Sequence, residues 1–159
     1  MTEVLRPGLL EDVRFLIAGA GELGEAVAAR MTALGAAAGE PAAVLVWDGA
    51  AAFAAATGVD AVRAALDGGW EAIRSGMADG LLIVLLAPRP GDAHAEAARA
   101  GLENMARTLS IEWARLGIRP VAVHPGPATP AGEVAELAAY LASPAGAYFS
   151  GCRFDLGGV

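Results

Sequence analysis

Residues 13–24 read VRFLIAGAGELG, an apolar run that ends in a glycine-rich turn. The run before Gly19 has the length and composition of a strand buried on both faces of a parallel sheet. After the turn, apolar residues recur at helical spacing, and Gly35 stands where a helix C-cap is expected. The segment therefore predicts a strand, a tight turn and a helix in succession. The apolar positions of the predicted helix are Leu23, Val27, Met31 and Leu34.

The same alternation continues along the chain. Strands and helices in turn predict an α/β protein with a doubly wound parallel sheet of about five strands. We expect one Rossmann-like domain over residues 1–159. The segment 36–42 is interpreted as a loop and 49–58 as an alanine-rich connector. Further strands are predicted at 43–48, 81–86, 118–123 and 152–156, and further helices at 59–77, 92–116 and 131–143.

Charge and composition exclude several classes of function. The chain has 159 residues and a formal net charge of −7, and all 11 of its basic residues are arginines. Without lysine, Schiff-base catalysis and a lysine-dependent phosphate loop are excluded. The negative charge disfavours nucleic acid as a partner. A single cysteine, Cys152, forms neither an internal disulfide nor a cysteine cluster for zinc, and no metal site is expected.

Two features bear on location. The longest strongly apolar stretch, residues 81–87, is far shorter than the roughly 18 residues of a membrane span, so we expect no membrane association. The first residues, Met1 to Glu3, lack the basic flank and apolar core of a secretory signal. We therefore expect a cytoplasmic protein.

The glycines of the turn follow the pattern G-x-G-x-x-G, as Gly19, Gly21 and Gly24. In a dinucleotide site the first allows a tight turn, the second lets the backbone approach a pyrophosphate, and the third lets helix and strand pack closely. Leu23 lies inside the pattern. We predict that these four residues bind a cofactor, although such a turn also occurs where a sheet merely packs tightly. Glu22 opposes the prediction, because its charge repels a nearby phosphate.

Asp48 ends the second long apolar run, 24 residues after Gly24. An acidic residue about 20 residues after the glycines binds the ribose hydroxyls in many dinucleotide sites. Asp48 is therefore a candidate for that contact. The alternative interpretation, that Asp48-Gly49 is only a turn, carries equal weight.

The chain resembles the short-chain dehydrogenase/reductase family, most clearly in its second half. Residues 99–114 look like the family's long active-site helix, and 117–126 are similar to its strand and Pro-Gly turn beside the nicotinamide. Residues 11–36 look like its first strand and helix, 133–143 like its last helix, and 151–158 like its C-terminal strand and Asp-x-Gly-Gly ending.

The resemblance implies NAD or NADP as cofactor and adds Arg99, Pro125 and Gly126 to the candidate cofactor-binding residues. It also implies that subunits pair through the helices at 59–77 and 92–116. The expected partner is a second copy, in a homodimer or homotetramer, or a longer active member of the family. A face of small, uncharged residues on the second helix would permit close pairing: Ala97, Gly101, Asn104 and Thr108.

The family's catalytic groups are missing from the corresponding positions. Ala95 stands at the position of the tyrosine, Arg99 at that of the lysine, and Ala87 at that of the serine. Arginine can hold a ribose or phosphate but cannot relay a proton at neutral pH. Asp92 and His94, at the start of the long helix, are interpreted as a cap and a solvent-facing side chain, and His124 as a packed strand-end residue. We therefore assign no catalytic residue.

These departures favour a pseudoenzyme or non-catalytic subunit that keeps the fold. The alternative is an atypical NAD(P)-dependent oxidoreductase that reduces a carbonyl or oxidises an alcohol with substitute groups. A third possibility, a carrier of acyl ligands, has no motif in its favour. The resemblance also implies that a strand–helix unit after residue 36 and a substrate loop after Gly126 are missing.

The position of strand 43–48 is open between two interpretations. The resemblance implies that it lies between strands 13–18 and 81–86. The right-handedness of crossover connections instead favours the outer side of strand 13–18, which gives the order 2-1-3-4-5 for the predicted strands. We favour the outer position.

Overall fold

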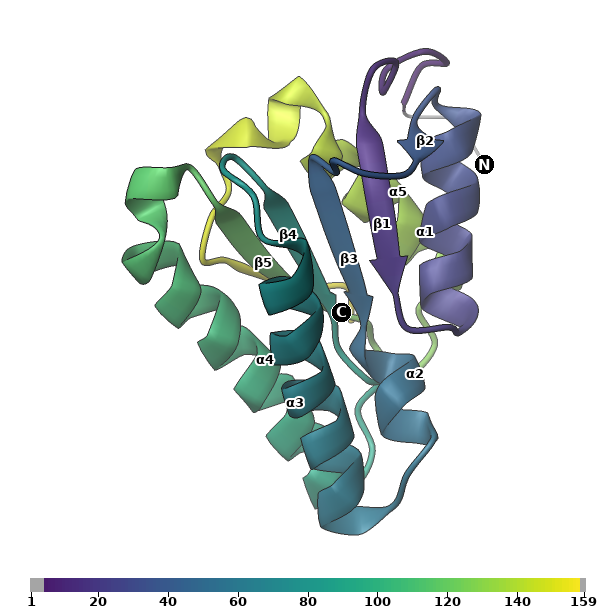
Figure 1. Ribbon diagram of the computed structural model, residues 1–159. Helices are drawn as coiled ribbons and strands as arrows, with labels where there is room; N and C mark the ends of the chain where they lie inside the picture. Colours follow the sequence, from purple (N-terminus) through teal and green to yellow (C-terminus); the bar gives the residue numbers. More distant parts are fainter. Residues whose placement is uncertain (1–4, 158–159) are drawn as a thin grey trace.

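The computed structural model of the protein describes residues 5–157. Two sequence expectations concern residues outside this range. One is the absence of a secretory signal at residues 1–3, and the other involves Gly158, the last glycine of the Asp-x-Gly-Gly ending. Figure 1 shows one twisted sheet with helices on both faces. The strands are β1 (Arg14–Ala18), β2 (Ala37–Ala38), β3 (Val44–Asp48), β4 (Leu82–Leu86), β5 (Arg119–His124) and β6 (Arg153–Asp155).

All five neighbouring strand pairs are parallel, and the order in the sheet is β2-β1-β3-β4-β5-β6. The predicted α/β class and doubly wound parallel sheet are confirmed. The sheet has six strands, one more than expected, because Ala37 and Ala38, in the predicted loop, pair with Arg14 and Phe15.

The favoured position of strand 43–48 is wrong. β3 lies between β1 and β4, as the resemblance implies, with Phe15 opposite Val44 and Val44 opposite Leu82. The helix after β1 leads outward to β2, which takes the outer position. A short segment without a helix then carries the chain back to the start of β3.

The helices divide between the two faces of the sheet (Figure 1). α1 (Glu22–Ala33) packs beside α5 (Ala131–Ala142) on one face. α3 (Gly58–Gly76) packs beside α4 (Ala93–Glu112) on the other. The predicted connector 49–58 is wrong in part, because it contains the short helix α2 (Gly49–Ala54). The predicted helix 92–116 ends as an α-helix at Glu112 and continues as a 3-10 turn, Ala114–Leu116; a second 3-10 segment, Pro144–Tyr148, follows α5.

Two apolar clusters form the core, one on each face of the sheet. Every residue of β3 and β4 is buried, whereas Leu16, Ile17 and Ala18 of β1 are only half-buried. The difference follows from β2, which pairs with only the first two residues of β1.

Within residues 5–157, no helix is both long and apolar enough to cross a bilayer.

Candidate functional site

β1 and β3 are neighbours whose chains leave the sheet on opposite faces. After β1 the chain enters α1 on the face shared with α5, and after β3 it enters α2, which packs on α3. In open α/β sheets, ligands bind in the crevice at such a switch point. A pocket of about 420 Å³ lies there. It is lined by Ala20, Gly21, Glu22, Leu23, Asp48, Ala50, Ala51, Ala54, Ala55 and Arg89.

Gly19 and Gly24 have the roles expected of the first and third glycines. Gly19 has φ +87°, a backbone conformation that favours glycine. A Cβ atom on Gly24 would lie 3.0 Å from Cγ2 of Ile17 on β1, so glycine here lets α1 pack closely on the strand. Leu23, in the first turn of α1, is buried and lines the pocket.

The second glycine, Gly21, is required by the protein itself. A Cβ atom on Gly21 would lie 2.5 Å from Cβ of Ala51 in α2 and 3.0 Å from Oδ2 of Asp48. The glycine turn and the first turn of α2 therefore lie too close together for a side chain at position 21. Gly21 is needed whether or not a ligand is bound.

Asp48 caps two helices from the end of β3. Its Oδ1 accepts a hydrogen bond from the Ala51 N–H at 2.9 Å, in the first turn of α2. Its Oδ2 accepts one from the Gly24 N–H at 2.8 Å, in the first turn of α1. The residue is fully buried. Both carboxylate oxygens are thus engaged inside the protein, and the ribose contact stays a prediction without support from this geometry.

Arg89 is a residue of the pocket that the sequence analysis missed. It follows β4, and its Nη1 donates hydrogen bonds to the carbonyl oxygens of Gly126, at 3.3 Å, and Thr129, at 2.7 Å. Its Nη2 lies 3.8 Å from Oε2 of Glu22 across the pocket. A signal was present, because Arg89 stands three residues after the end of a buried parallel strand, β4, at the carboxyl end of the sheet where such sites form.

Arg99 joins two loops from within α4. Its Nη1 donates hydrogen bonds to the carbonyl oxygens of Pro88, at 2.7 Å, and Pro125, at 2.9 Å. Its side chain is 12% exposed, and its Nε lies 3.7 Å from Oε2 of Glu96. The structure thus brings Arg99 to the Pro-Gly turn, with its guanidinium held by backbone carbonyls, and its contact with a cofactor stays a prediction.

Gly126 lies beneath the C-terminal segment. A Cβ atom there would lie 2.6 Å from Cα of Gly157. The Gly126 N–H donates to the hydroxyl of Thr129 at 2.8 Å, and that hydroxyl donates to the carbonyl oxygen of Leu156 at 2.7 Å. Pro125 and Gly126 are not among the residues that line the pocket, and Arg89, which contacts both Gly126 and Glu22, connects the two regions.

The positions that the resemblance assigns to catalysis carry no acid or nucleophile, since they are Ala87, Ala95 and Arg99. Ala87 and Ala95 are buried, so a tyrosine ring at position 95 would meet a packed interior. Asp92 caps α4 by accepting hydrogen bonds from the His94 and Ala95 N–H groups at 3.0 and 2.9 Å. The hydrogen bond from Ala95 holds the pKa of Asp92 below its usual value. The proposed capping role of Asp92 agrees with this geometry.

His124, at the end of β5, is a buried and poorly paired imidazole. Its side chain is 4% exposed, and its Nδ1 lies 3.8 Å from Oδ1 of Asp155. Its Nε2 is buried without a hydrogen-bond partner among residues 5–157. Burial lowers the pKa of His124 from its ordinary value of 6.5, and the charge of Arg99 lowers it further. The neutral form is therefore favoured, which agrees with a packed histidine.

The predicted contact face on α4 is only partly free. Ala97, Asn104 and Thr108 are exposed. Gly101, however, packs against α3 in the same chain, because a Cβ atom on it would lie 2.7 Å from both Cδ atoms of Leu66. The expectation that Gly101 lies on a free face is therefore wrong.

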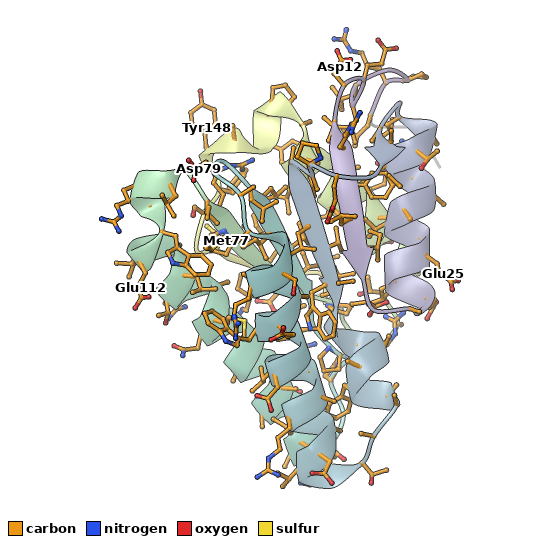
Figure 2. The ribbon with its side chains drawn as sticks, viewed as in Figure 1. Asp12, Glu25, Met77, Asp79, Glu112 and Tyr148 are labelled. Carbon is orange, nitrogen blue, oxygen red and sulfur yellow. The ribbon has the colours of Figure 1, made fainter. Side chains whose placement is uncertain are left out.

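Aromatic residues join α3 to the end of α4. Trp70 stacks on Trp113 with ring centroids 6.1 Å apart, and Trp70 remains 41% exposed. Figure 2 shows Met77 at the end of α3 and Glu112 at the end of α4 on this side of the molecule.

Within residues 5–157, no cluster of histidine, cysteine and acidic side chains is arranged to hold a metal ion.

Many solved structures share this architecture. The citronellol catabolism dehydrogenase AtuB of Pseudomonas aeruginosa PAO1 aligns with a TM-score of 0.72 and 23% identity, over 98% of each chain. BdcA of E. coli, solved with NADPH, gives 0.74 and 19% over 95% of each chain. The angucycline C-6 ketoreductase LanV, with bound NADP, gives 0.75 and 14%, over 96% of this chain and 97% of LanV.

No model of a known protein family matches the sequence. The structural likeness nevertheless extends over nearly the whole described chain and includes a short-chain dehydrogenase/reductase of Serratia marcescens, with a TM-score of 0.75 at 17% identity. The chain has the fold of the short-chain dehydrogenases/reductases.

Proposed function

We propose that the protein is a non-catalytic NAD(P)-binding subunit with the short-chain dehydrogenase/reductase fold. One observation carries the proposal. The pocket at the switch point between β1 and β3 is present, while the three positions expected to carry catalysis are Ala87, Ala95 and Arg99. The protein would hold a cofactor, and would pair with other subunits, without transferring hydride.

The residues of the pocket suit the diphosphate group of a dinucleotide better than they suit its ribose. Its volume lies within the range of about 300–1,000 Å³ usual for small-molecule sites. The turn from Gly19 to Gly24 and Arg89 would hold the phosphates. Asp48, the acidic residue expected to hold the ribose, is engaged by Gly24 and Ala51. The other acidic lining residue, Glu22, faces Arg89. BdcA with NADPH and LanV with NADP support NAD or NADP as the cofactor class.

A bound nicotinamide supplies hydride chemistry in dehydrogenases, and the protein must then supply or accept a proton. In this chain Arg99 stands at the position that the resemblance assigns to the lysine. Its guanidinium stays charged at neutral pH and donates hydrogen bonds to the carbonyl oxygens of Pro88 and Pro125. Loss of a positioned general acid costs a factor of about 10²–10⁴ in rate. Arg99 therefore holds the loops that contain Pro88 and Pro125 and does not move a proton.

Titration of the purified protein with NADH and NADPH, followed by nicotinamide fluorescence, tests the proposal. BdcA serves as the positive control for NADPH. We expect saturable binding and no oxidation of the cofactor when a panel of ketones and aldehydes is added. Turnover would favour the alternative, an atypical oxidoreductase. Absence of binding would reject the cofactor assignment.

We further propose that copies of the chain pair through α3 and α4, or that a longer active relative takes that place. Exposed apolar side chains on this side support the proposal, because an uncovered apolar surface favours association. Val59 is 59% exposed, Trp70 41% and Met77 49%. Two-fold pairing of identical faces is the usual symmetry.

Light scattering at micromolar concentration tests this pairing. Because Gly101 packs inside the chain, the variants are Val59→Arg and Thr108→Arg, at exposed positions on the two helices. We expect a dimer or tetramer for the parent and a monomer for the double variant. Arginine at Gly132, where a side chain meets open space on α5, is the control and should leave the assembly intact.

A further inference from the structure

The guanidinium of Arg89 is held in place by one side only. Its Nη1 donates to the carbonyl oxygens of Gly126 and Thr129, at 3.3 and 2.7 Å. These contacts fix the plane of the group at the rim of the pocket, where Arg89 is one of the lining residues. A donor fixed before a ligand arrives loses little conformational entropy on binding.

The other side of the guanidinium faces Glu22. The distance from Nη2 to Oε2 of Glu22 is 3.8 Å, which is an ion pair but too long for a hydrogen bond. The side chain of Glu22 is 72% exposed, whereas that of Arg89 is 31% exposed. Nη2 therefore has no hydrogen-bond acceptor in the described part of the chain. An anion entering the pocket would find these N–H groups available.

The remaining charges of the pocket disfavour an anion. Asp48 already places a carboxylate at the first turn of α1 and takes the Gly24 N–H for itself. Glu22 adds a second carboxylate at the mouth. Arg89 is the single cation among the residues that line the pocket. Any phosphate bound here must therefore gain most of its charge stabilisation from Arg89.

We propose that Arg89 is the phosphate-binding residue of this pocket and that Glu22 competes with the ligand for it. The ligand class is a molecule with a diphosphate group, and Glu22 must turn toward solvent when the ligand binds. This inference rests on the proposed cofactor site and adds the residue that holds the phosphates and the residue that limits their affinity.

A plain surface ion pair gives a different expectation. Exposed pairs contribute little to stability, and removing Glu22 would then change neither folding nor ligand affinity. Competition, in contrast, predicts that removing the Glu22 charge strengthens binding. The sign of the effect of one substitution therefore separates the two accounts.

The experiment measures binding of inorganic pyrophosphate and of NADPH by calorimetry to the parent, to four single variants and to one double variant. Glu22→Gln removes the competing charge, and Glu25→Gln is its matched control. Glu25 lies in the same first turn of α1, is exposed and points away from the pocket side (Figure 2). Arg89→Gln removes the phosphate contact, and Arg89→Lys keeps the charge without the planar fork.

We expect Glu22→Gln to tighten pyrophosphate binding about three- to tenfold, and Glu25→Gln to leave it unchanged. Arg89→Gln should weaken binding about 10- to 100-fold, with Arg89→Lys between it and the parent. In the double variant of Glu22→Gln with Arg89→Gln, the gain from Glu22→Gln should disappear. Circular dichroism checks that each variant is folded.

Equal effects of Glu22→Gln and Glu25→Gln on pyrophosphate affinity would overturn the inference. If Arg89→Gln fails to fold, Arg89→Lys takes its place, and an unchanged pyrophosphate affinity in that variant would also overturn the inference. The two probes distinguish this failure from that of the proposed function. Pyrophosphate binding with the expected pattern, but no NADPH binding, supports the inference and rejects the cofactor. NADPH binding that is insensitive to Glu22 and Arg89 supports the cofactor and rejects the inference.

Discussion

Asp48 Oδ2 accepts a hydrogen bond from the Gly24 N–H at 2.8 Å, and this bond joins the end of β3 to the first turn of α1. The same carboxylate caps α2 through Ala51. An anion near a helix N-terminus stabilises that helix. A negative charge supplied by the protein therefore occupies part of the space where a dinucleotide fold usually receives its phosphate.

Asp48→Asn should lower the free energy of unfolding by about 1–3 kcal/mol, because one buried N–H group loses its charged acceptor. The urea midpoint measures the loss. Asp67→Asn, at an exposed position of α3, is the control and should change little. A ribose-binding role would give the opposite pattern, with normal stability and weaker NADPH binding.

Gly21→Ala should destabilise the protein by about 1–3 kcal/mol through its collision with Ala51. Removing the opposing methyl group tests the cause. In the double variant Gly21→Ala with Ala51→Gly, thermal unfolding should return most of the way to that of the Ala51→Gly single variant. No recovery would mean that the collision is not the cause.

The alternation of apolar runs and helical patterns predicted the fold well, because both periodicities come from burial on a sheet covered on two faces. The strand order could not be obtained in this way. Ala37 and Ala38 make a strand of two residues with no apolar signal, and without that strand the handedness rule points to the wrong neighbour for β3.

The glycine turn was likewise predicted from the sequence, but its hydrogen bond to Asp48 was not. The carboxylate of Asp48 was recognised as important from its distance to Gly24 along the sequence. Its direction depends on α2, which lies in a run of alanines that carries no amphipathic pattern. Arg89 was missed because its role depends on two carbonyl groups about 40 residues later in the chain, Gly126 and Thr129.

His124 should make the protein less stable as the pH falls below about 6.5. Burial lowers its pKa in the folded state, so the unfolded chain binds a proton that the folded chain does not. The free energy of unfolding therefore rises with pH through this window, by at most about 1.4 kcal/mol per pH unit for one proton. Urea unfolding at pH 5 to 7.5 measures the slope.

His124→Gln should flatten that slope. An equal slope in the parent and in His124→Gln would contradict the assignment.

Gly132→Ala and Gly101→Ala should differ in their effect on stability, although both glycines are helical. A Cβ atom on Gly132 meets open space, so alanine should stabilise α5 by about 0.5–1 kcal/mol. On Gly101 it meets Leu66 of α3, and the required displacement should cancel that gain. Thermal unfolding of the two variants side by side measures the difference, and equal stabilisation would show that α3 and α4 are less closely packed.

The proposed function requires that the chain binds a nicotinamide cofactor and does not transfer its hydride. The most direct test is calorimetric titration with NADPH, followed by the absorbance of the saturated complex at 340 nm during incubation with a carbonyl panel. We predict a saturable binding isotherm and a constant absorbance, whereas BdcA provides the positive control for binding. A fall in absorbance that depends on both protein and carbonyl would contradict the non-catalytic assignment, and a flat isotherm would contradict cofactor binding.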